Sequence, residues 1–351
     1  MARAGPATLY NEGMIRADLS SLPAYVPGKR QPDALKLSSN EATQPPLPAA
    51  VQAMAAAAAG ANRYPDMGAV AIREALAAHL GVDFEQTAVG AGSSALCQQL
   101  VQVTCTDGDE VVFPWRSFEA YPIFAQVHGA IPVAVPLVNQ AVSLADMVAA
   151  ITEKTRLIFV CNPNNPTGTT VTRADFAEFM TQVPADVVVA LDEAYFEYVR
   201  GEDMPVATEL VHEYPNLVGL RTFSKAYGLA GVRIGYAFGP AELIEAMNKV
   251  CIPFSVNSVA QAGAVASLAA QDELRERTDL AVEQRARVAQ HLGAASSQAN
   301  FVWLPGLGSD VADKLAAEGV LVRAFPEGIR ITITTPEETD QLLAAWDKCH
   351  A

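Results

Sequence analysis

The sequence predicts an α/β protein with a large, doubly wound, mostly parallel sheet domain and a smaller α+β domain. The first observation is a regular alternation of short apolar runs with helical segments, which is the pattern of successive βαβ units. The second is that several runs are β-branched and apolar on both faces, as buried parallel strands are. They lie at 156–161, 187–191, 217–221 and 234–238. Such a sheet binds its ligands at the carboxyl ends of its strands.

Four segments are expected along the 351 residues. Residues 1–13 have neither a signal-peptide nor a transit-peptide pattern, and we expect a disordered extension there. Residues 14–48 are rich in proline and polar residues, so we expect an arm that crosses the surface and joins the small domain. Residues 49–255 should form the large domain, which holds the ligand, and residues 256–351 the small C-terminal domain.

Helices and further strands of the large domain follow from local patterns. An alanine-rich helix is predicted at 47–59 from the high helix propensity of alanine. Thr172 and Asp175 have capping-box-like spacing and predict the start of a helix between two strands. Further strands are predicted at 110–113 and 131–135, and further helices end near Leu80 and Val103 or span 117–127 and 242–249.

The small domain is predicted from the last third of the chain. One long helical stretch is expected at 258–292, and its charged run at 272–277 is interpreted as a solvated helix face. Strand-like alternation then returns before a final helix. These last strands are predicted at 300–304, 319–323 and 330–334, and the helix at 336–348.

Composition limits the classes of partner. The net charge of −15 and the lack of any lysine- or arginine-rich run argue against a nucleic-acid surface. No apolar run approaches the roughly 20 residues of a membrane span. The five cysteines are scattered, without a Cys-x-x-Cys pair, and predict reduced thiols and no metal site. We therefore predict a cytoplasmic protein that binds small molecules, and neither nucleic acid nor a membrane.

Lys225 directly follows an apolar run that is typical of a strand, and small residues follow it. A lone lysine is most often a solvated surface charge. A lysine that attacks carbonyls, however, must be held where its charge is disfavoured, with room for a bulky partner. The hydroxyls of Thr222 and Ser224 and the guanidinium of Arg233 suit an anion such as a phosphate. This combination predicts a Schiff-base lysine beside a phosphate pocket.

The glycine-rich turn at 90–95 allows three interpretations. It fits the loose GxGxxA form of a dinucleotide fingerprint, but Glu110 begins its strand, whereas the ribose-binding acid should close it. It can also be a plain turn. In the third interpretation it opens a helix whose free N–H groups, with the hydroxyls of Ser93 and Ser94, hold a phosphate. We favour the third because it agrees with the pocket predicted around Lys225.

Two other strand ends carry polar residues. The run Cys161-Asn-Pro-Asn-Asn-Pro-Thr-Gly168 is by default a turn-rich loop. Asp192 ends another apolar run, and its carboxylate can either cap a helix or face a site. Tyr195 follows three residues later.

In this order and spacing, the motifs around Asn165, Asp192, Tyr195 and Lys225 resemble those of fold-type I pyridoxal-phosphate (PLP) aminotransferases, from about Met14 to the end of the chain. The resemblance implies that fold, with PLP held on Lys225. It implies that Asn165 and Tyr195 bond the ring oxygen of the cofactor. It also implies that Asp192 keeps the pyridine nitrogen protonated, so that the ring accepts electrons.

The same resemblance assigns further positions. Phe118 matches an aromatic residue that stacks on the cofactor ring, with a core phenylalanine as the alternative. Tyr64 matches a tyrosine that reaches the phosphate of the neighbouring subunit's cofactor, which implies a homodimer with shared active sites. Arg330 matches the arginine that binds the substrate's α-carboxylate, for which a planar guanidinium is suited. Tyr25 and Asn40 fall where related enzymes place substrate-side residues.

Within this superfamily the chain resembles the histidinol-phosphate aminotransferase branch, and more closely the aromatic amino-acid aminotransferases of actinobacteria. The phrases that carry the likeness lie at 36–41, 61–68, 113–122 and 323–328. The resemblance implies ping-pong amino transfer between phenylalanine or tyrosine and 2-oxo acids such as 2-oxoglutarate. In that reaction Lys225 moves the proton of the substrate's α-carbon.

Histidinol phosphate is the alternative substrate. A similarly placed arginine in that branch binds the substrate's phosphate, and Arg323 matches it, although Arg323 can equally meet the distal carboxylate of glutamate. The short link between Arg323 and Arg330 favours the aromatic substrate by analogy.

Lyases, decarboxylases and racemases of the same fold share the framework of Lys225, Asp192 and Arg233. A non-catalytic PLP-binding regulator should carry a DNA-binding domain, for which there is neither room nor a basic segment.

Overall fold

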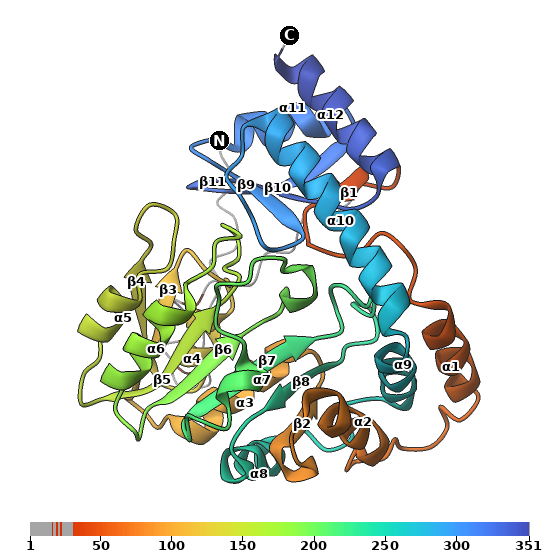
Figure 1. Cartoon of the computed structure of the whole chain (residues 1–351). Helices are drawn as coiled ribbons and strands as arrows, with labels where there is room; N and C mark the ends of the chain where they lie inside the picture. The colour runs from red at the N-terminus through yellow and green to blue at the C-terminus, as the bar shows by residue number, and fades with distance from the viewer. Residues whose placement is uncertain (1–15, 17–18, 20–21, 23–30, 351) are drawn as a thin grey trace, which may run out of the picture.

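The computed structural model describes residues 16, 19, 22 and 31–350 (Figure 1). The predicted extension at 1–13 and the predicted site residue Tyr25 lie outside this part of the chain. The described chain forms a seven-stranded sheet covered by helices and a four-stranded sheet above it in Figure 1. None of the described helices is long and apolar enough to cross a membrane.

The larger sheet has the strand order β2-β8-β7-β6-β5-β3-β4. Its strands are β2 (Thr87–Gly90), β3 (Glu110–Trp115), β4 (Ile131–Pro136), β5 (Thr155–Cys161), β6 (Val188–Asp192), β7 (Leu217–Thr222) and β8 (Gly235–Phe238). The five strands from β4 to β7 in this order pair in parallel. The predicted α/β class with a mostly parallel sheet is therefore confirmed.

Strand β8 corrects one prediction. The apolar run at 234–238 was expected to be parallel, but β8 is antiparallel to both of its neighbours, β7 and β2. A parallel return needs a crossover, which is usually a helix. The described chain between β7 and β8 forms no α-helix and is a loop that turns straight back. That loop carries Lys225, and the reversal keeps it at the strand ends.

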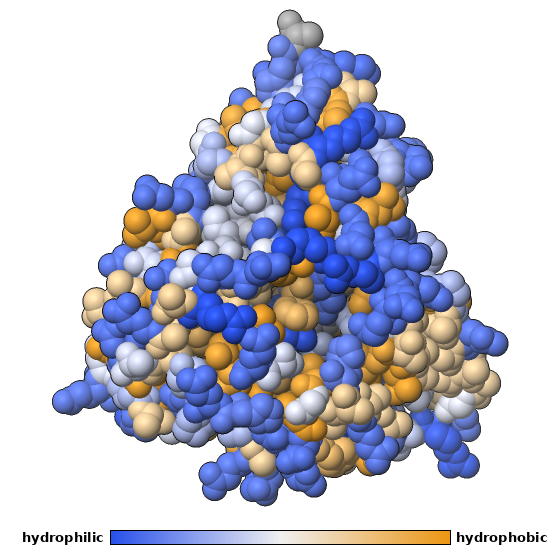
Figure 2. Space-filling view, viewed as in Figure 1, coloured by the Kyte–Doolittle hydropathy of each residue, from blue (hydrophilic) through white to orange (hydrophobic). Residues whose placement is uncertain are grey.

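Helices cover both faces of this sheet, because successive residues of β5 enter separate cores: Ile158 and Val160 on one side, Leu157 and Phe159 on the other. The first side is covered by α1 (Pro48–Ala58), α2 (Val70–Leu80), α5 (Leu144–Ala149), α6 (Arg173–Gln182), α7 (Ala207–Leu210) and α9 (Ser258–Ala269). The second is covered by α3 (Ser93–Thr104), α4 (Tyr121–Val127) and α8 (Ala241–Val250). The alanine-rich α1 shows as a pale apolar patch at the lower right of Figure 2.

The smaller sheet has the order β1-β10-β11-β9. Its strands are β1 (Leu35–Leu37), β9 (Phe301–Pro305), β10 (Val320–Phe325) and β11 (Gly328–Thr332), and α11 (Ser309–Ala317) and α12 (Pro336–His350) pack with them. Strand β1 runs parallel to β10, so the segment before residue 48 contributes to this sheet. The domain boundaries at 48 and 255 stay predictions.

Two predicted helices are wrong in their extent. The stretch at 258–292 breaks at Ala270 into α9 and α10 (Gln271–Leu292). Acidic side chains at Asp272 and Glu273 lie in the first turn of α10, where they favour a helix start, so the charged run marks a new helix. The helix predicted at 117–127 is shorter and begins at Tyr121, the first residue of α4. Pro122 lacks an N–H and is tolerated only in the first turn of a helix, so the helix cannot begin earlier. The predicted start of α6 is confirmed, with Thr172 accepting a bond from the Asp175 N–H.

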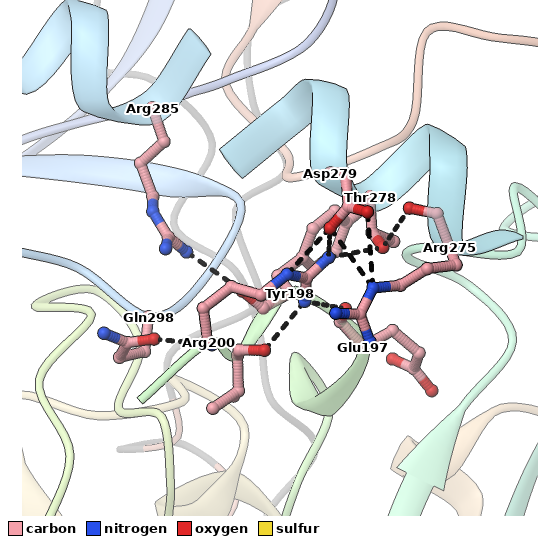
Figure 3. A network of polar contacts seen from close by, with 9 residues as sticks. Glu197, Tyr198, Arg200, Arg275, Thr278, Asp279, Arg285 and Gln298 are labelled. Atoms are coloured by element: carbon pink, nitrogen blue, oxygen red, sulfur yellow. Dashed lines mark hydrogen bonds and ion pairs between the residues drawn. The ribbon is translucent and has the colours of Figure 1, made fainter. Parts of the chain in front are cut away.

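Hydrogen bonds join helix α10 to the segment that follows β6 (Figure 3). The residues that form them are here termed the α10 clamp and are Tyr198, Arg200, Thr278, Asp279 and Arg285. Arg200 donates hydrogen bonds from Nη2 to Thr278 Oγ1 at 2.9 Å and to Asp279 Oδ1 at 2.6 Å. Arg285, which is buried, donates from Nη1 to the carbonyl oxygen of Tyr198 at 3.2 Å. These bonds tie the helix that leads to the small sheet to the strand end that carries Asp192.

Candidate active site

The strand ends of the large sheet and the β10–β11 hairpin of the small sheet enclose a cavity of about 450 Å³. Most of the predicted site residues line it, although they are spread over nearly 300 positions of the sequence. They are Asn40, Ser93, Ser94, Phe118, Asn165, Asp192, Tyr195, Thr222, Ser224, Lys225, Arg233, Arg323 and Arg330. The site therefore lies where parallel strands end, as expected for this class of sheet.

Lys225 lies in the loop after β7 and points into this cavity. Its Nζ donates a hydrogen bond to the carbonyl oxygen of Ser39 at 3.2 Å. Burial, together with the nearby positive charge of Arg330, lowers the pKa of Lys225 to about 8. The neutral amine, which is the nucleophilic form, is therefore far more populated near neutral pH than in an exposed lysine.

Asp192 ends β6 and is only 4% exposed. Burial raises its pKa to about 6, and a hydrogen bond from the Tyr121 hydroxyl to Oδ2 at 2.6 Å opposes that rise. The backbone N–H of Ala194 donates to Oδ1 at 3.2 Å. The carboxylate is thus ionised and fixed at neutral pH. Sequence reasoning missed Tyr121, although it stands three residues after Phe118 in a phrase that carried the family likeness.

A group of donors converges at one end of the cavity. Ser93 and Ser94 form the first turn of α3, whose N–H groups have no partners within the helix. Thr222 ends β7, and Ser224 follows it. Arg233 donates from Nη1 to Ser224 Oγ at 3.2 Å, which brings the guanidinium to the same end. Hydroxyls, a helix N-terminus and a guanidinium are together groups that can bind a phosphate.

Two glycines allow this close approach. A Cβ added at Gly92 would stand 2.2 Å from Nη2 of Arg233, and one at Gly235 would stand 2.3 Å from the backbone nitrogen of Ser93. Gly92 also has φ of +83°, which side chains rarely adopt. The glycine-rich turn therefore lets Arg233 approach the start of α3, and its interpretation as part of a phosphate site stays a prediction.

Asn40 and Tyr195 form a rigid wall of the cavity. Asn40 Nδ2 donates to the Tyr195 hydroxyl oxygen at 2.9 Å, and the Asn40 side chain accepts from Thr332 Oγ1 at 3.0 Å. Burial raises the pKa of Tyr195, so its phenol keeps its proton at neutral pH and can donate it in a hydrogen bond. Asn40 has φ of 56°, a conformation that asparagine tolerates better than most residues.

Arg330 and Arg323 enter the cavity from the small sheet. Arg330 donates to Asn165 Oδ1 at 2.6 Å and to the Ser38 carbonyl at 2.7 Å, and it is 7% exposed. Arg323 donates to Glu119 Oε2 at 2.9 Å. The remaining wall is apolar. It consists of Phe118, Ile123, Phe124 and Phe325.

Some lining residues had no usable signal in the sequence. Ser38 and Ser39 act through backbone carbonyls, so the identity of their side chains carries no information about the site. Glu119 lies in the segment 113–122, which carries part of the family resemblance. Its pairing with Arg323, however, depends on how the two sheets approach each other. Phe325 lies in the phrase 323–328 and was likewise not singled out.

Tyr64 does not line the cavity in this chain. Its side chain is 81% exposed and its ring stacks on Phe254, with centroids 4.6 Å apart. The role expected for it involves the cofactor of a neighbouring subunit, and that role stays a prediction.

The fold and this cavity agree with an aminotransferase, and the family is shown by the similarity of the chain to known proteins. The chain belongs to the class I and II aminotransferase family, whose model matches residues 32–345. It is 69% identical over 344 residues to the aromatic amino acid aminotransferase of Corynebacterium diphtheriae, covering 96% of this chain and 100% of that protein. It is 57% identical to the aromatic amino acid aminotransferase of Rhodococcus jostii, covering 94% of each chain.

Among solved structures, the chain is similar to histidinol-phosphate aminotransferase from Sinorhizobium meliloti in complex with pyridoxal-5'-phosphate. The TM-score is 0.88 and the identity 29%, covering 96% of this chain and 97% of that one. The predicted recognition as a fold-type I aminotransferase is confirmed. The protein is a transaminase, and its family implies PLP as the cofactor.

Proposed function

We propose that this transaminase moves amino groups between phenylalanine or tyrosine and 2-oxo acids such as 2-oxoglutarate, with PLP and by a ping-pong route. Support for the aromatic substrate comes from relatives at 57–69% identity that are named aromatic amino acid aminotransferases. The apolar wall of Phe118, Ile123, Phe124 and Phe325 supports it independently, because it suits a flat hydrocarbon side chain.

The residues of the cavity fit PLP. Ser93, Ser94, Thr222, Ser224 and Arg233 would hold its phosphate, at the end where glycines let the guanidinium meet the α3 N-terminus. The remaining contacts are assigned to the ring: Asp192 to its nitrogen, Phe118 to its face, Asn165 and Tyr195 to its hydroxyl oxygen, and Lys225 to its aldehyde. When bound, the cofactor supplies an electron-accepting ring next to the substrate's α-carbon.

The chain's own residues then divide the work. The amine of Lys225, with its lowered pKa, is suited to take the proton from the substrate's α-carbon and to return it at the neighbouring position. The Asp192 carboxylate, fixed by Tyr121 and the Ala194 N–H, holds positive charge on the ring nitrogen. Arg330 is placed to bind the α-carboxylate with two parallel hydrogen bonds. The observation that carries the proposal is that Lys225, Asp192 and Arg330 share one cavity.

A homodimer with shared active sites in the cytoplasm is part of this proposal. The exposed aromatic pair of Tyr64 and Phe254 supports it, as does the exposed Ile252, at 74%, because such apolar surface is typical of an interface. The apolar patch on α1 in Figure 2 also supports it.

Histidinol phosphate is the second candidate, since Arg323 faces the cavity and a solved histidinol-phosphate aminotransferase has a similar fold. However, the relatives at 57–69% identity are named aromatic amino acid aminotransferases, whereas the solved histidinol-phosphate aminotransferase is 29% identical. We therefore expect the purified holoenzyme to prefer phenylalanine over histidinol phosphate as amino donor by about 100-fold in kcat/KM, with 2-oxoglutarate as acceptor. The measurement compares both substrates with the same enzyme preparation. A preference for histidinol phosphate would overturn the aromatic assignment, and absence of amino transfer from either would favour a different reaction of this fold.

A further inference from the structure

Arg323 and Arg330 stand directly opposite each other on the β10–β11 hairpin. Both side chains line the cavity. Like charges directly opposite on neighbouring strands repel each other, so this pair is unfavourable unless counter-charges or acceptors compensate. Two positive groups side by side in one cavity match a ligand with two carboxylates.

The two arginines have different partners. Arg330 donates to neutral acceptors, Asn165 Oδ1 at 2.6 Å and the Ser38 carbonyl at 2.7 Å. Arg323 donates to a full negative charge, Glu119 Oε2 at 2.9 Å. A ligand carboxylate that meets Arg323 must therefore compete with Glu119.

Glu119 has a second arginine within reach. Its Oε1 lies 3.9 Å from Nη1 of Arg116, and Arg116 itself donates two hydrogen bonds to the Glu327 carboxylate, at 2.9 and 2.8 Å. The Glu119 side chain is 30% exposed, so it retains access to water. Glu119 can leave Arg323 and still face a positive charge, which lowers the cost of that movement.

We propose that Glu119 is a specificity-determining residue that lets this one site accept both an uncharged aromatic side chain and the side-chain carboxylate of a dicarboxylic substrate. With an aromatic substrate, Glu119 neutralises Arg323. With a dicarboxylic substrate, the distal carboxylate takes Arg323 and Glu119 turns to Arg116. The inference rests on the proposed function, because a ping-pong enzyme for these substrates must bind both kinds of side chain in turn.

The physical reason is desolvation. A guanidinium covered by an aromatic side chain would lose water without gaining a hydrogen-bond acceptor or counter-charge, and that would disfavour the aromatic substrate. The Glu119 carboxylate removes this penalty, at the expense of competition with the distal carboxylate of a substrate such as 2-oxoglutarate. Phe325 sits under the same pair, with the Arg323 guanidinium 5.4 Å from its ring centre, so the aromatic and charged parts of the subsite are contiguous.

Two substitutions provide a matched test. Glu119→Gln removes the competing charge while keeping the shape, and Glu318→Gln removes the same charge from a surface ion pair with Lys348 that involves neither Arg116 nor Arg323. Glutarate and 3-phenylpropionate are suitable probes, because they carry one common carboxylate and differ in the second group. Binding to the holoenzyme is measured by calorimetry, together with KM for 2-oxoglutarate and for phenylpyruvate.

For Glu119→Gln we expect glutarate to bind about three- to tenfold more tightly, with KM for 2-oxoglutarate lower by a similar factor. Binding of 3-phenylpropionate should weaken or stay the same, and Glu318→Gln should change the binding of neither probe. If Glu119→Gln fails to tighten glutarate, or tightens both probes alike, or if Glu318→Gln has the same effect, the inference is wrong. If the wild type binds both probes but does not transfer amino groups from phenylalanine, the proposed function fails, and the glutarate comparison still reports on Glu119.

Discussion

Two polar clusters flank the short segment that follows β6, and they use their polar groups in opposite ways. On one side Asp192 and Tyr195 face the cavity, where Lys225 also points. On the other side Arg200 and Arg285 in the α10 clamp donate to partners within the protein (Figure 3). Asp192 and Arg200 lie within ten residues of each other in the chain, so the difference comes from what each side chain faces.

Lys225 and Arg285 show what this difference means. Burial lowers the pKa of both cations, to about 8 for Lys225 and about 10 for Arg285. Arg285 offsets its lost hydration with bonds to the carbonyl oxygens of Tyr198 and Ala299, at 3.2 and 2.8 Å. Lys225 has a single hydrogen bond of 3.2 Å to the Ser39 carbonyl, and the rest of its compensation is left to a ligand. The clamp should therefore govern stability and the cavity should govern activity.

The largest effect should come from Lys225→Ala. Removing the amine should lower the rate of amino transfer by at least about 10³-fold, because proton transfer by a positioned group contributes on that scale. The fold should persist, since no polar network of the core depends on this side chain in the way the clamp depends on Arg285. The measurement is kcat with phenylalanine and 2-oxoglutarate, beside borohydride reduction in the presence of PLP.

The matched control for that variant is Lys249→Ala, which removes an exposed lysine paired with Glu245. It should retain both the activity and the covalent trapping of PLP on reduction. A Lys225→Ala protein that still trapped PLP covalently would show that another lysine holds the cofactor.

The opposite behaviour is expected for Arg285→Met in the clamp. The change leaves the carbonyls of Tyr198 and Ala299 without this donor, so the free energy of unfolding should fall by about 2–4 kcal/mol. Specific activity of the folded enzyme should stay close to the wild type. Urea denaturation at fixed protein concentration measures the first quantity, and kcat the second.

Arg287→Met is the control on the same helix, where Arg287 pairs with Asp340 at the surface. Its effect should stay below about 1 kcal/mol, because exposed ion pairs contribute little. An Arg285→Met enzyme with unchanged stability and lost activity would remove the distinction between clamp and cavity.

The part of the site that could be predicted from the sequence is the part placed by parallel strand ends. Asp192 ends β6, and Lys225 follows β7 by three residues, so a correct assignment of these runs as strands was enough to bring them together. The phosphate end followed in the same way from Ser93 and Arg233, once the turn before α3 was interpreted as a helix start.

What could not be predicted depends on contacts between elements. The direction of β8 was missed because an apolar run looks the same in either direction. The pairing of Glu119 with Arg323 depends on how the two sheets approach each other, and local patterns do not encode that. The carbonyl of Ser39 is a partner for Lys225 whatever side chain stands there.

The smallest expected effect is on the stability of the apoprotein, and its pH dependence tests whether the buried charge of Lys225 is unfavourable. Because burial lowers the pKa of Lys225 from 10.5 to about 8, the folded chain binds this proton less tightly than the unfolded chain does. The destabilisation by Lys225 is therefore fully present below about pH 8 and is relieved as the pH rises towards 10.5. We expect apo Lys225→Met to be more stable than the apo wild type at pH 7 by about 1–3 kcal/mol.

That gap should narrow above pH 8 and close near pH 10.5, which denaturant titrations of both apoproteins across this range can follow. Lys249→Met is the control, since its exposed side chain should give no gap that changes with pH. A gap of constant size would mean that Lys225→Met acts through packing and that the lysine's charge is not strained in the empty site. A gap that closes with rising pH would show that the buried charge of Lys225 destabilises the apoprotein. The buried charge of Arg285, by contrast, is compensated by its hydrogen bonds to Tyr198 and Ala299.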